Sequence, residues 1–301
     1  MKDPHPSAID VHQHLWPAAF LDALRSRRRP PMVRDWVLHT VGEAPYAVEP
    51  RDHDPVRRTS IDLGVGTILL APSAPLGIEC LPPAEALVLL DAWHEGIREL
   101  GAPFSGWAAI SSVDPDLDGL ADLLDDPALV GLQVPATLVG DPAALELATP
   151  VLRRCEQLDR PVLVHPGPAR GASGSPLWWP AVVDYVAQLQ AAWWAWFAVG
   201  RTLLPRLRIC FAAGAGLAPV HHERLQQRGG GPFVVDPGVY VDTSSYGRQG
   251  VDALVRALGI DGVVLGSDRP YAALTDPGQG AAAWRQISRN NPVRLLQGEV
   301  T

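Results

Sequence analysis

Lysine is almost absent from this sequence: Lys2 is the only one, and 24 of the 25 basic residues are arginine. Lysine is the side chain that forms Schiff bases with carbonyl substrates. Its carbamylated form can also bridge two metal ions. Because Lys2 stands beside the N-terminus, the sequence predicts neither Schiff-base chemistry nor a lysine bridge between two metals.

Cysteine is scarce as well. Cys80, Cys155 and Cys210 are far apart and show no paired spacing. A disulfide framework, or a zinc site built from thiolates, needs closely paired cysteines, so neither is predicted. This usage is typical of a reducing cytoplasm. The N-terminus lacks the apolar run of a signal peptide, so we expect a cytoplasmic protein.

Long apolar runs and basic clusters are missing too. The most apolar stretch, residues 185–204, is interrupted by Gln188, Gln190 and Arg201, so we expect a buried helix and no membrane partner. The formal net charge is −8, and the one basic run, residues 25–29, is expected to be a solvated loop. Nucleic-acid binders present a basic face, so no nucleic-acid partner is expected.

Eight short apolar runs alternate with amphipathic stretches along the chain. Such runs are typical of parallel strands that are buried on both faces. The runs cover residues 8–12, 64–71, 106–113, 130–135, 161–165, 207–212, 239–243 and 262–267. The helical stretches include residues 84–100, 141–158, 219–227, 248–258 and 281–296. This alternation without a linker predicts one α/β domain over residues 1–301, a (β/α)8 TIM barrel.

The segment between the first and second predicted strands is unusually long. It covers residues 15–62 and is rich in proline and arginine. A long insertion in a barrel is more often functional than idle. We expect this insertion to form a cap over the carboxyl ends of the strands.

Possible metal ligands stand at the carboxyl ends of three predicted strands. His12 and His14 close the first strand, His165 ends the fifth, and Asp268 follows the eighth. Residues two apart on a strand point to the same side, and barrel enzymes place their sites at these strand ends. Three imidazoles and a carboxylate suit one divalent cation, zinc above all, with a position open for water. Asp10 is expected to support a ligand by hydrogen bonding.

These residues lie within motifs that resemble a known family. The segment IDVHQHLWP is similar to the first-strand D-x-H-x-H motif of the amidohydrolase superfamily, and further similarities follow in order at VGLQVP, VLVHPG, VYVDTS, VVLGSDRP and NPVRLL. The resemblance spans residues 9–296. It is strongest to the amidohydrolase-2 branch, which contains aminocarboxymuconate-semialdehyde, resorcylate and carboxyvanillate decarboxylases together with lactone hydrolases. It implies a metal-dependent enzyme that acts on a small-molecule substrate.

One position departs from that branch. The branch carries a histidine after strand six in an H-x-G-G segment, whereas this chain has RICFAAGAGLAP, with Ala213 in the histidine's place. In the family this histidine helps to deprotonate the metal-bound water or polarises the substrate, which alanine cannot do. Either Asp268 serves as the proton acceptor alone, or the site binds metal and ligand without turnover. We expect His221 and His222, which follow closely, on the surface of a helix.

Aromatic and cationic side chains near the predicted barrel mouth are candidate substrate contacts. Arg170, Arg248 and Arg269 could pair with a substrate carboxylate, because a guanidinium matches carboxylate geometry. Trp16 and Trp178 could form walls for a flat, apolar ligand. The segment AAWWAWF is expected to pack as a helix and could also form the contact of a homodimer.

The sequence leaves three functions open. The first is a hydrolase that attacks an amide, lactone or similar carbonyl with metal-activated water, with Asp268 as the catalytic proton acceptor. The second is a non-oxidative decarboxylase of a small aromatic or unsaturated acid. The third is a metal-bearing binding protein that lost the ancestral reaction at Ala213. We expect the hydrolase; no serine-nucleophile elbow or phosphate-binding glycine motif competes with it.

Overall fold

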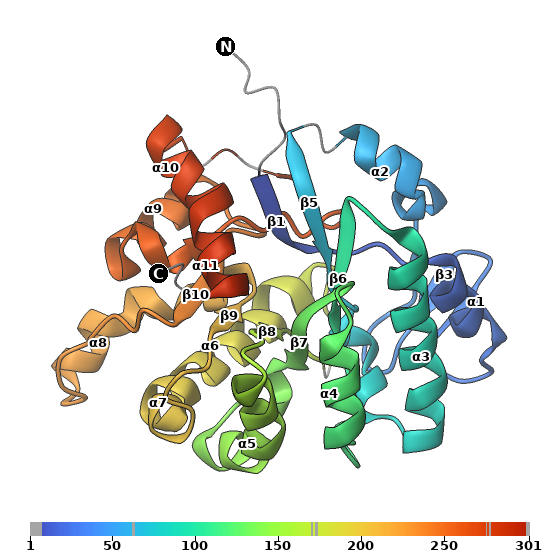
Figure 1. Ribbon diagram of the computed structural model, residues 1–301, viewed down its shortest axis with the longest axis horizontal. Helices are drawn as coiled ribbons and strands as arrows, with labels where there is room; N and C mark the ends of the chain where they lie inside the picture. The colour runs from blue at the N-terminus through green and yellow to red at the C-terminus, as the bar shows by residue number, and fades with distance from the viewer. Residues whose placement is uncertain are drawn as a thin grey trace.

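The computed structural model describes residues 8–61, 64–169, 171, 174–274, 276 and 278–298. Its centre is an eight-stranded parallel sheet whose strands follow one another in chain order (Figure 1). The strands are β1 (Ala8–Gln13), β5 (Val65–Leu70), β6 (Phe104–Ala108), β7 (Leu129–Pro135), β8 (Val162–His165), β9 (Ile209–Phe211), β10 (Val239–Asp242) and β11 (Val263–Val264). The Val11 N–H donates to the Leu265 carbonyl at 2.8 Å, which joins β1 to the chain beyond β11. The sheet is therefore a nearly closed barrel, as predicted.

Successive residues of the strands contribute to two different cores. Leu163 belongs to an interior cluster together with Cys210 and Tyr240 from neighbouring strands. Val162 and Val164, on either side of Leu163, belong to the larger cluster shared with the helices. Both faces of these strands are buried, which is why each strand appears in the sequence as a continuous apolar run.

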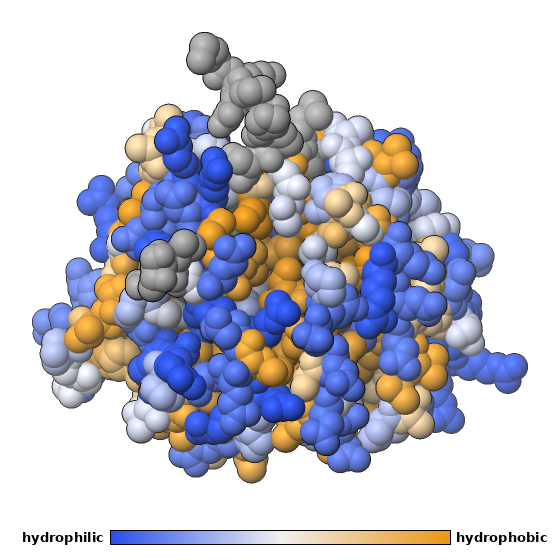
Figure 2. Space-filling view, in the orientation of Figure 1, coloured by the Kyte–Doolittle hydropathy of each residue, from blue (hydrophilic) through white to orange (hydrophobic). Residues whose placement is uncertain are grey.

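Helices cover the outside of the barrel (Figure 1). They are α3 (Pro83–Leu100), α4 (Leu117–Asp125), α5 (Pro142–Gln157), α6 (Tyr185–Ala195), α7 (Arg201–Leu203), α8 (His222–Gln227), α9 (Arg248–Leu258), α10 (Ala281–Arg285) and α11 (Asn291–Gln297). On the face shown in Figure 2, hydrophilic side chains are interspersed with apolar ones. Among the helices that the structure describes, none has the length and apolar character needed to cross a lipid bilayer.

Some predicted boundaries are wrong. The predicted strand over residues 106–113 is β6, which begins and ends earlier, and the strand over residues 262–267 shortens to β11. The helix predicted over residues 219–227 begins only at His222. A 3-10 segment, Ala213–His221, precedes it, and its first turns have left-handed backbone that an α-helix cannot include.

The long segment after β1 has secondary structure of its own. It contains α1 (Ala18–Ser26), a three-stranded antiparallel sheet of β2 (Met32–Arg34), β3 (Val37–His39) and β4 (Tyr46–Ala47), and α2 (Pro55–Ile61). Helix α1 packs against α3 on the outside of the barrel. Leu38 and Tyr46 of the small sheet instead line a central cavity, so the insertion contributes to the wall of the site described next.

Candidate metal centre

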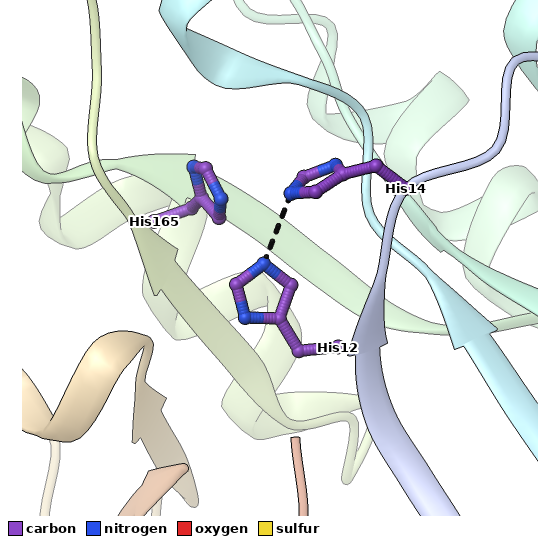
Figure 3. Close-up of side chains that lie close together, drawn as sticks. All are labelled: His12, His14 and His165. Atoms are coloured by element: carbon purple, nitrogen blue, oxygen red, sulfur yellow. Dashed lines mark hydrogen bonds between the residues drawn. The ribbon is translucent and has the colours of Figure 1, made fainter. Parts of the chain in front are cut away.

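Three buried histidines meet at the carboxyl ends of β1 and β8. His12 and His14 come from the end of β1, and His165 is the last residue of β8. One ligand atom of each lies within 4.8 Å of the others, and the ring centroids are 4.9 to 5.1 Å apart. Figure 3 shows the three rings converging from two sides. The structure therefore contains the histidine cluster that the sequence suggested, buried as a metal site requires.

The Nδ1 atom of each ring faces an oxygen of the protein. For His12 this oxygen is Oδ2 of Asp242 at 2.7 Å, and for His14 and His165 it is the backbone carbonyl of residue 71 or 166, each at 2.9 Å. Such acceptors hold the ring proton on Nδ1. Each Nε2 lone pair is then available to a metal ion.

The Nε2 atoms of His12 and His14 lie only 3.1 Å apart. Burial lowers the pKa of His12, but the Asp242 carboxylate beside its Nδ1 raises it to about 9, so without a metal ion this ring can carry a second proton on Nε2, between the two atoms. A divalent cation would take the place of that proton. Burial and the neighbouring histidines hold the pKa of His165 well below its usual range, so this ring is neutral and can act as a ligand. The donor set thus fits one divalent cation.

Asp268 lies beside two of these rings. Its Oδ1 atom is 3.2 Å from His14 Nε2 and 3.7 Å from His12 Nε2. Its own N–H donates to the His12 carbonyl at 2.8 Å, which fixes the residue with a left-handed φ of 58°. Burial opposes ionisation, but the neighbouring His14, His12 and His165 rings lower the pKa of Asp268 to about 2. The ionised carboxylate can serve as a fourth ligand or as a proton acceptor.

Asp242, at the end of β10, orients His12 and was not predicted. Its Oδ2 faces the His12 ring, and its Oδ1 accepts hydrogen bonds from the N–H groups of Ala213 and Ser244. Asp10, the predicted support, accepts from the His12 backbone N–H at 3.1 Å through Oδ1 and from the Gln13 side-chain amide at 2.8 Å through Oδ2, so it holds the end of β1 rather than an imidazole. The position of Asp242 at a strand end, in the motif VYVDTS, was the available signal.

The chain after β9 forms a left-handed turn at the edge of the site. Residues 213–217 all have φ between 44° and 61°. Ala213, Ala215 and Leu217 have side chains, so each costs roughly 1–2 kcal/mol in this conformation. Backbone strain of this kind is often retained at functional sites. The turn places the Ala213 methyl group in the cavity wall, where the resemblance leads one to expect an imidazole.

His221 and His222 do not replace that imidazole. His221 is exposed, and the His222 ring stacks on Phe233 at 5.4 Å. Both lie at the junction of the 3-10 segment and α8, outside the described cavity lining.

A cavity of about 820 Å³ opens beside the three histidines, a volume in the range of small-molecule sites. Its wall combines the insertion, the segments that follow β8 and β9, helix α6, and the chain after β11. Most of the lining is apolar and includes Leu38, Leu76, Leu177, Val182, Val186 and Leu189. The polar lining side chains include Glu43, Tyr46, Ser73, Tyr185, Ser245, Tyr246 and Tyr271.

Neither predicted tryptophan wall belongs to the described lining. Trp16 is buried behind the site, where its indole N–H donates to Ser73 Oγ at 3.1 Å and its ring stacks on His53. Trp178 lies at the surface with 56% of its area exposed, and Leu177 takes the position in the wall. Trp16 points away because its partners, Ser73 and His53, come from distant segments, whereas the ring of the exposed Trp178 contacts the adjacent Trp179.

The predicted arginine contacts also lie elsewhere or cannot be placed. Arg248 is exposed at the start of α9, and neither it nor Arg269 is part of the described lining. The backbone of Arg269 is used structurally, since its carbonyl accepts a hydrogen bond from the His14 N–H. Arg170 lies outside the described residues, so its predicted contact stays a prediction.

Tyrosines, rather than tryptophans, approach the histidines. The Tyr271 ring centroid is 5.4 Å from that of His14, and Tyr46 lies beside Tyr271. Tyr185 of α6 donates to Glu43 of the insertion at 2.7 Å. No periodic pattern in the sequence indicated these residues, because Tyr46, Tyr271 and Glu43 lie in loops or in a short strand of the insertion.

A family model described as amidohydrolase matches residues 9–296. The chain belongs to this amidohydrolase family. The family resemblance inferred from the strand-end motifs is thereby confirmed over nearly the whole chain. Within the family, a 2-amino-3-carboxymuconate-6-semialdehyde decarboxylase of Dictyostelium discoideum is 27% identical over 185 residues, 56% of this chain and 52% of that protein. The chain therefore spans about half the length of this curated relative.

Solved structures of amidohydrolase-family decarboxylases share the fold. Metarhizium anisopliae IDCase in apo form has a TM-score of 0.77 at 16% identity and covers 97% of both chains. The 5-carboxyvanillate decarboxylase of Novosphingobium aromaticivorans, complexed with manganese and 4-hydroxy-3-methoxy-5-nitrobenzoic acid, has a TM-score of 0.75 at 16% identity and covers 98% of this chain and 97% of that one. At these identities the likeness concerns the barrel.

Proposed function

We propose that this protein is a metal-dependent, non-oxidative decarboxylase of a small aromatic or unsaturated acid. The observation that carries the proposal is the cluster of three histidines and Asp268 beside a largely apolar cavity. The relatives named as decarboxylases favour this reading over the hydrolase expected from the sequence. A flat apolar acid suits such a cavity, because its ring is buried while its carboxylate reaches the ligands.

In the proposed reaction, the metal site binds the substrate and Asp268 supplies the proton. A bound divalent cation would hold the substrate carboxylate and offset its charge. Asp268 is ionised, so it must take up a proton before it can deliver one. With 19% of its side chain exposed, it can take that proton from solvent. As the carboxyl carbon leaves as carbon dioxide, the electron pair of the broken bond stays on the substrate carbon, which receives the proton from Asp268.

The metal identity and the role of the insertion belong to the same proposal. Three imidazoles favour zinc, whereas the Novosphingobium enzyme is complexed with manganese, so metal analysis of the purified protein must decide.

We also propose that residues 15–62 act as a cap. Glu43 of the insertion accepts a hydrogen bond from Tyr185 of α6. The Gly42 carbonyl oxygen packs closely on Gly171, where a Cβ atom would lie only 1.9 Å from that oxygen. A homodimer remains a prediction.

The experiment measures carbon dioxide release by the metal-loaded protein from a panel of hydroxybenzoic and unsaturated acids. Turnover of one acid that is lost on Asp268→Asn, and retained by the exposed control Asp122→Asn, would support the proposal. The same preparations are tested with lactones and amides. Hydrolysis of those compounds without carbon dioxide release from any acid would overturn the decarboxylase in favour of the hydrolase.

A second candidate is a metal-bearing binding protein without turnover. The methyl group of Ala213 in the cavity wall favours it, because that group cannot move a proton. Under this reading the protein binds metal and aromatic acids but releases no carbon dioxide, and Ala213→His restores turnover. Turnover by the unmodified protein would exclude it.

A further inference from the structure

One carboxylate lines the cavity apart from the metal centre. Glu43 belongs to the insertion, between β3 and β4, and its Oε1 accepts a hydrogen bond of 2.7 Å from the hydroxyl of Tyr185. This bond ties the insertion to α6. Within the described part of the chain, no hydrogen bond involves the second oxygen, Oε2. One oxygen of Glu43 is therefore fixed by the protein, and the other can accept a ligand's donor.

The surroundings of Glu43 are acidic and apolar. The described lining residues include no lysine and no arginine. Asp184, the neighbour of Tyr185 in sequence, has a buried Oδ2 without a hydrogen-bond partner in the described structure. Burial raises the pKa of Glu43, and the nearby Asp184 charge adds to this effect. A cation at this position would be attracted by both carboxylates, since opposite charges stabilise the ionised form.

Two phenols lie between Glu43 and the histidines. The Tyr271 ring is 5.4 Å from the His14 ring, and Tyr46 lies next to both Tyr271 and Glu43. Glu43 and the histidines thus line the same largely apolar cavity, with these two phenols between them. A ligand that spans them carries a different group at each end.

We propose that Glu43, held by Tyr185, is a specificity-determining residue that binds an alkylammonium group on the substrate. The acid group of the same substrate lies at the histidines, so the substrate class is an aromatic or unsaturated acid with an amine-bearing substituent. The acid end rests on the proposed function; the amine end rests on the cavity alone. An ammonium is preferred to a hydroxyl because it neutralises a carboxylate that no described cation pairs with.

The test compares ligands that differ only in the charge of the substituent. Binding of 3- and 4-(aminomethyl)benzoate and of 3- and 4-ethylbenzoate to metal-loaded protein is measured by calorimetry, which needs no turnover. We expect one aminomethyl compound to bind roughly 10- to 100-fold more tightly than its ethyl partner. Glu43→Gln should abolish this difference, whereas Glu146→Gln, the same change at an exposed residue of α5, should preserve it.

Benzylamine and benzyl alcohol, tested on metal-free protein, separate this proposal from the proposed function. A preference for benzylamine that requires Glu43 supports the inference even if no acid is decarboxylated. Equal binding of each matched pair to the unmodified protein, or an unchanged preference in Glu43→Gln, would overturn it.

Two further variants locate the interaction. Tyr185→Phe keeps the carboxylate and should keep the amine preference. If Tyr185→Phe removes the preference while Glu43→Gln retains it, recognition lies in the phenol and the assignment to Glu43 is wrong. Arg170 lies outside the described residues. If the preference appears only in Arg170→Gln, Glu43 pairs with that guanidinium in the native protein, which also contradicts the proposal.

Discussion

His12 and Asp242 are 230 residues apart in the sequence, yet the Nδ1 atom of one lies 2.7 Å from the Oδ2 atom of the other. Both side chains are almost completely buried. The same carboxylate accepts a hydrogen bond from the Ala213 N–H. Asp242 therefore orients His12, a proposed metal ligand, and anchors the left-handed turn that forms part of the cavity wall.

Replacing Asp242 with asparagine should weaken metal binding by about 10- to 100-fold, as losses of such outer partners do. The amide is isosteric but has no charge to stabilise the Nδ1 proton of His12. Competition against a chromogenic chelator measures the affinity. Asp122→Asn, an exposed change on α4, should leave it unaltered. An Asp242→Asn protein that binds metal like the unmodified one would show that the pair is not needed to orient the ring.

Metal removal should lower the stability of the protein. A ligand present at 100 times its Kd stabilises the folded state by about 2.7 kcal/mol. We expect thermal melting to shift downward on dialysis against a chelator and to recover when a divalent cation is added. His165→Ala lacks one of the three nitrogens, so its melting temperature should not respond to metal. A response as large as that of the unmodified protein would mean that the ion binds elsewhere.

The barrel and the ligand cluster could be predicted because both depend on local pattern plus topology. Strands buried on both faces appear as apolar runs, and a residue at the carboxyl end of a barrel strand is directed to one common mouth. His165 follows Leu163 by two positions, so the interior position of Leu163 also fixes the direction of His165. The sequence carries this information without knowledge of tertiary contacts.

The cavity wall could not be predicted in the same way. Trp16 follows the strand end closely, but its direction is set by Ser73 and His53, which lie 57 and 37 residues away. Tyr46 and Glu43 come from the insertion, whose strands are too short to show an alternation of buried and exposed residues in the sequence. Side chains at strand ends and in loops are aimed by long-range partners, and a single sequence does not reveal those partners.

Arg58 of α2 should prove essential to the position of His14. This buried guanidinium donates to the His14 carbonyl through both terminal nitrogens at 3.2 Å, and to Gln13 Oε1 at 2.9 Å. Arg58→Met would leave buried acceptors without donors and should cost at least roughly 1.5 kcal/mol of unfolding free energy. Metal affinity should fall with it. The neighbouring exposed Arg57→Met serves as control, and equal effects of the two changes would contradict this role.

Glu79 should make the protein less stable as the pH rises. Burial raises the pKa of Glu79 from 4.5 to about 7, although the Gln133 side chain and the Glu79 backbone favour the ionised form. The folded state therefore holds the proton more tightly than the unfolded chain. Below pH 4.5 Glu79 is protonated in both states and does not lower the free energy of unfolding. Between pH 4.5 and pH 7 the free energy of unfolding falls progressively, and above pH 7 the loss is constant at about 3 kcal/mol.

Glu79→Gln removes the charge, so the variant should gain stability over the unmodified protein at pH 8 and show little difference at pH 4.5. Denaturant unfolding at the two pH values measures both differences. The exposed Glu146→Gln should give no pH-dependent gain. If Glu79→Gln changed the stability equally at both pH values, the effect would come from packing rather than from the proton, and the carboxyl would have to be ionised and solvated in the folded protein.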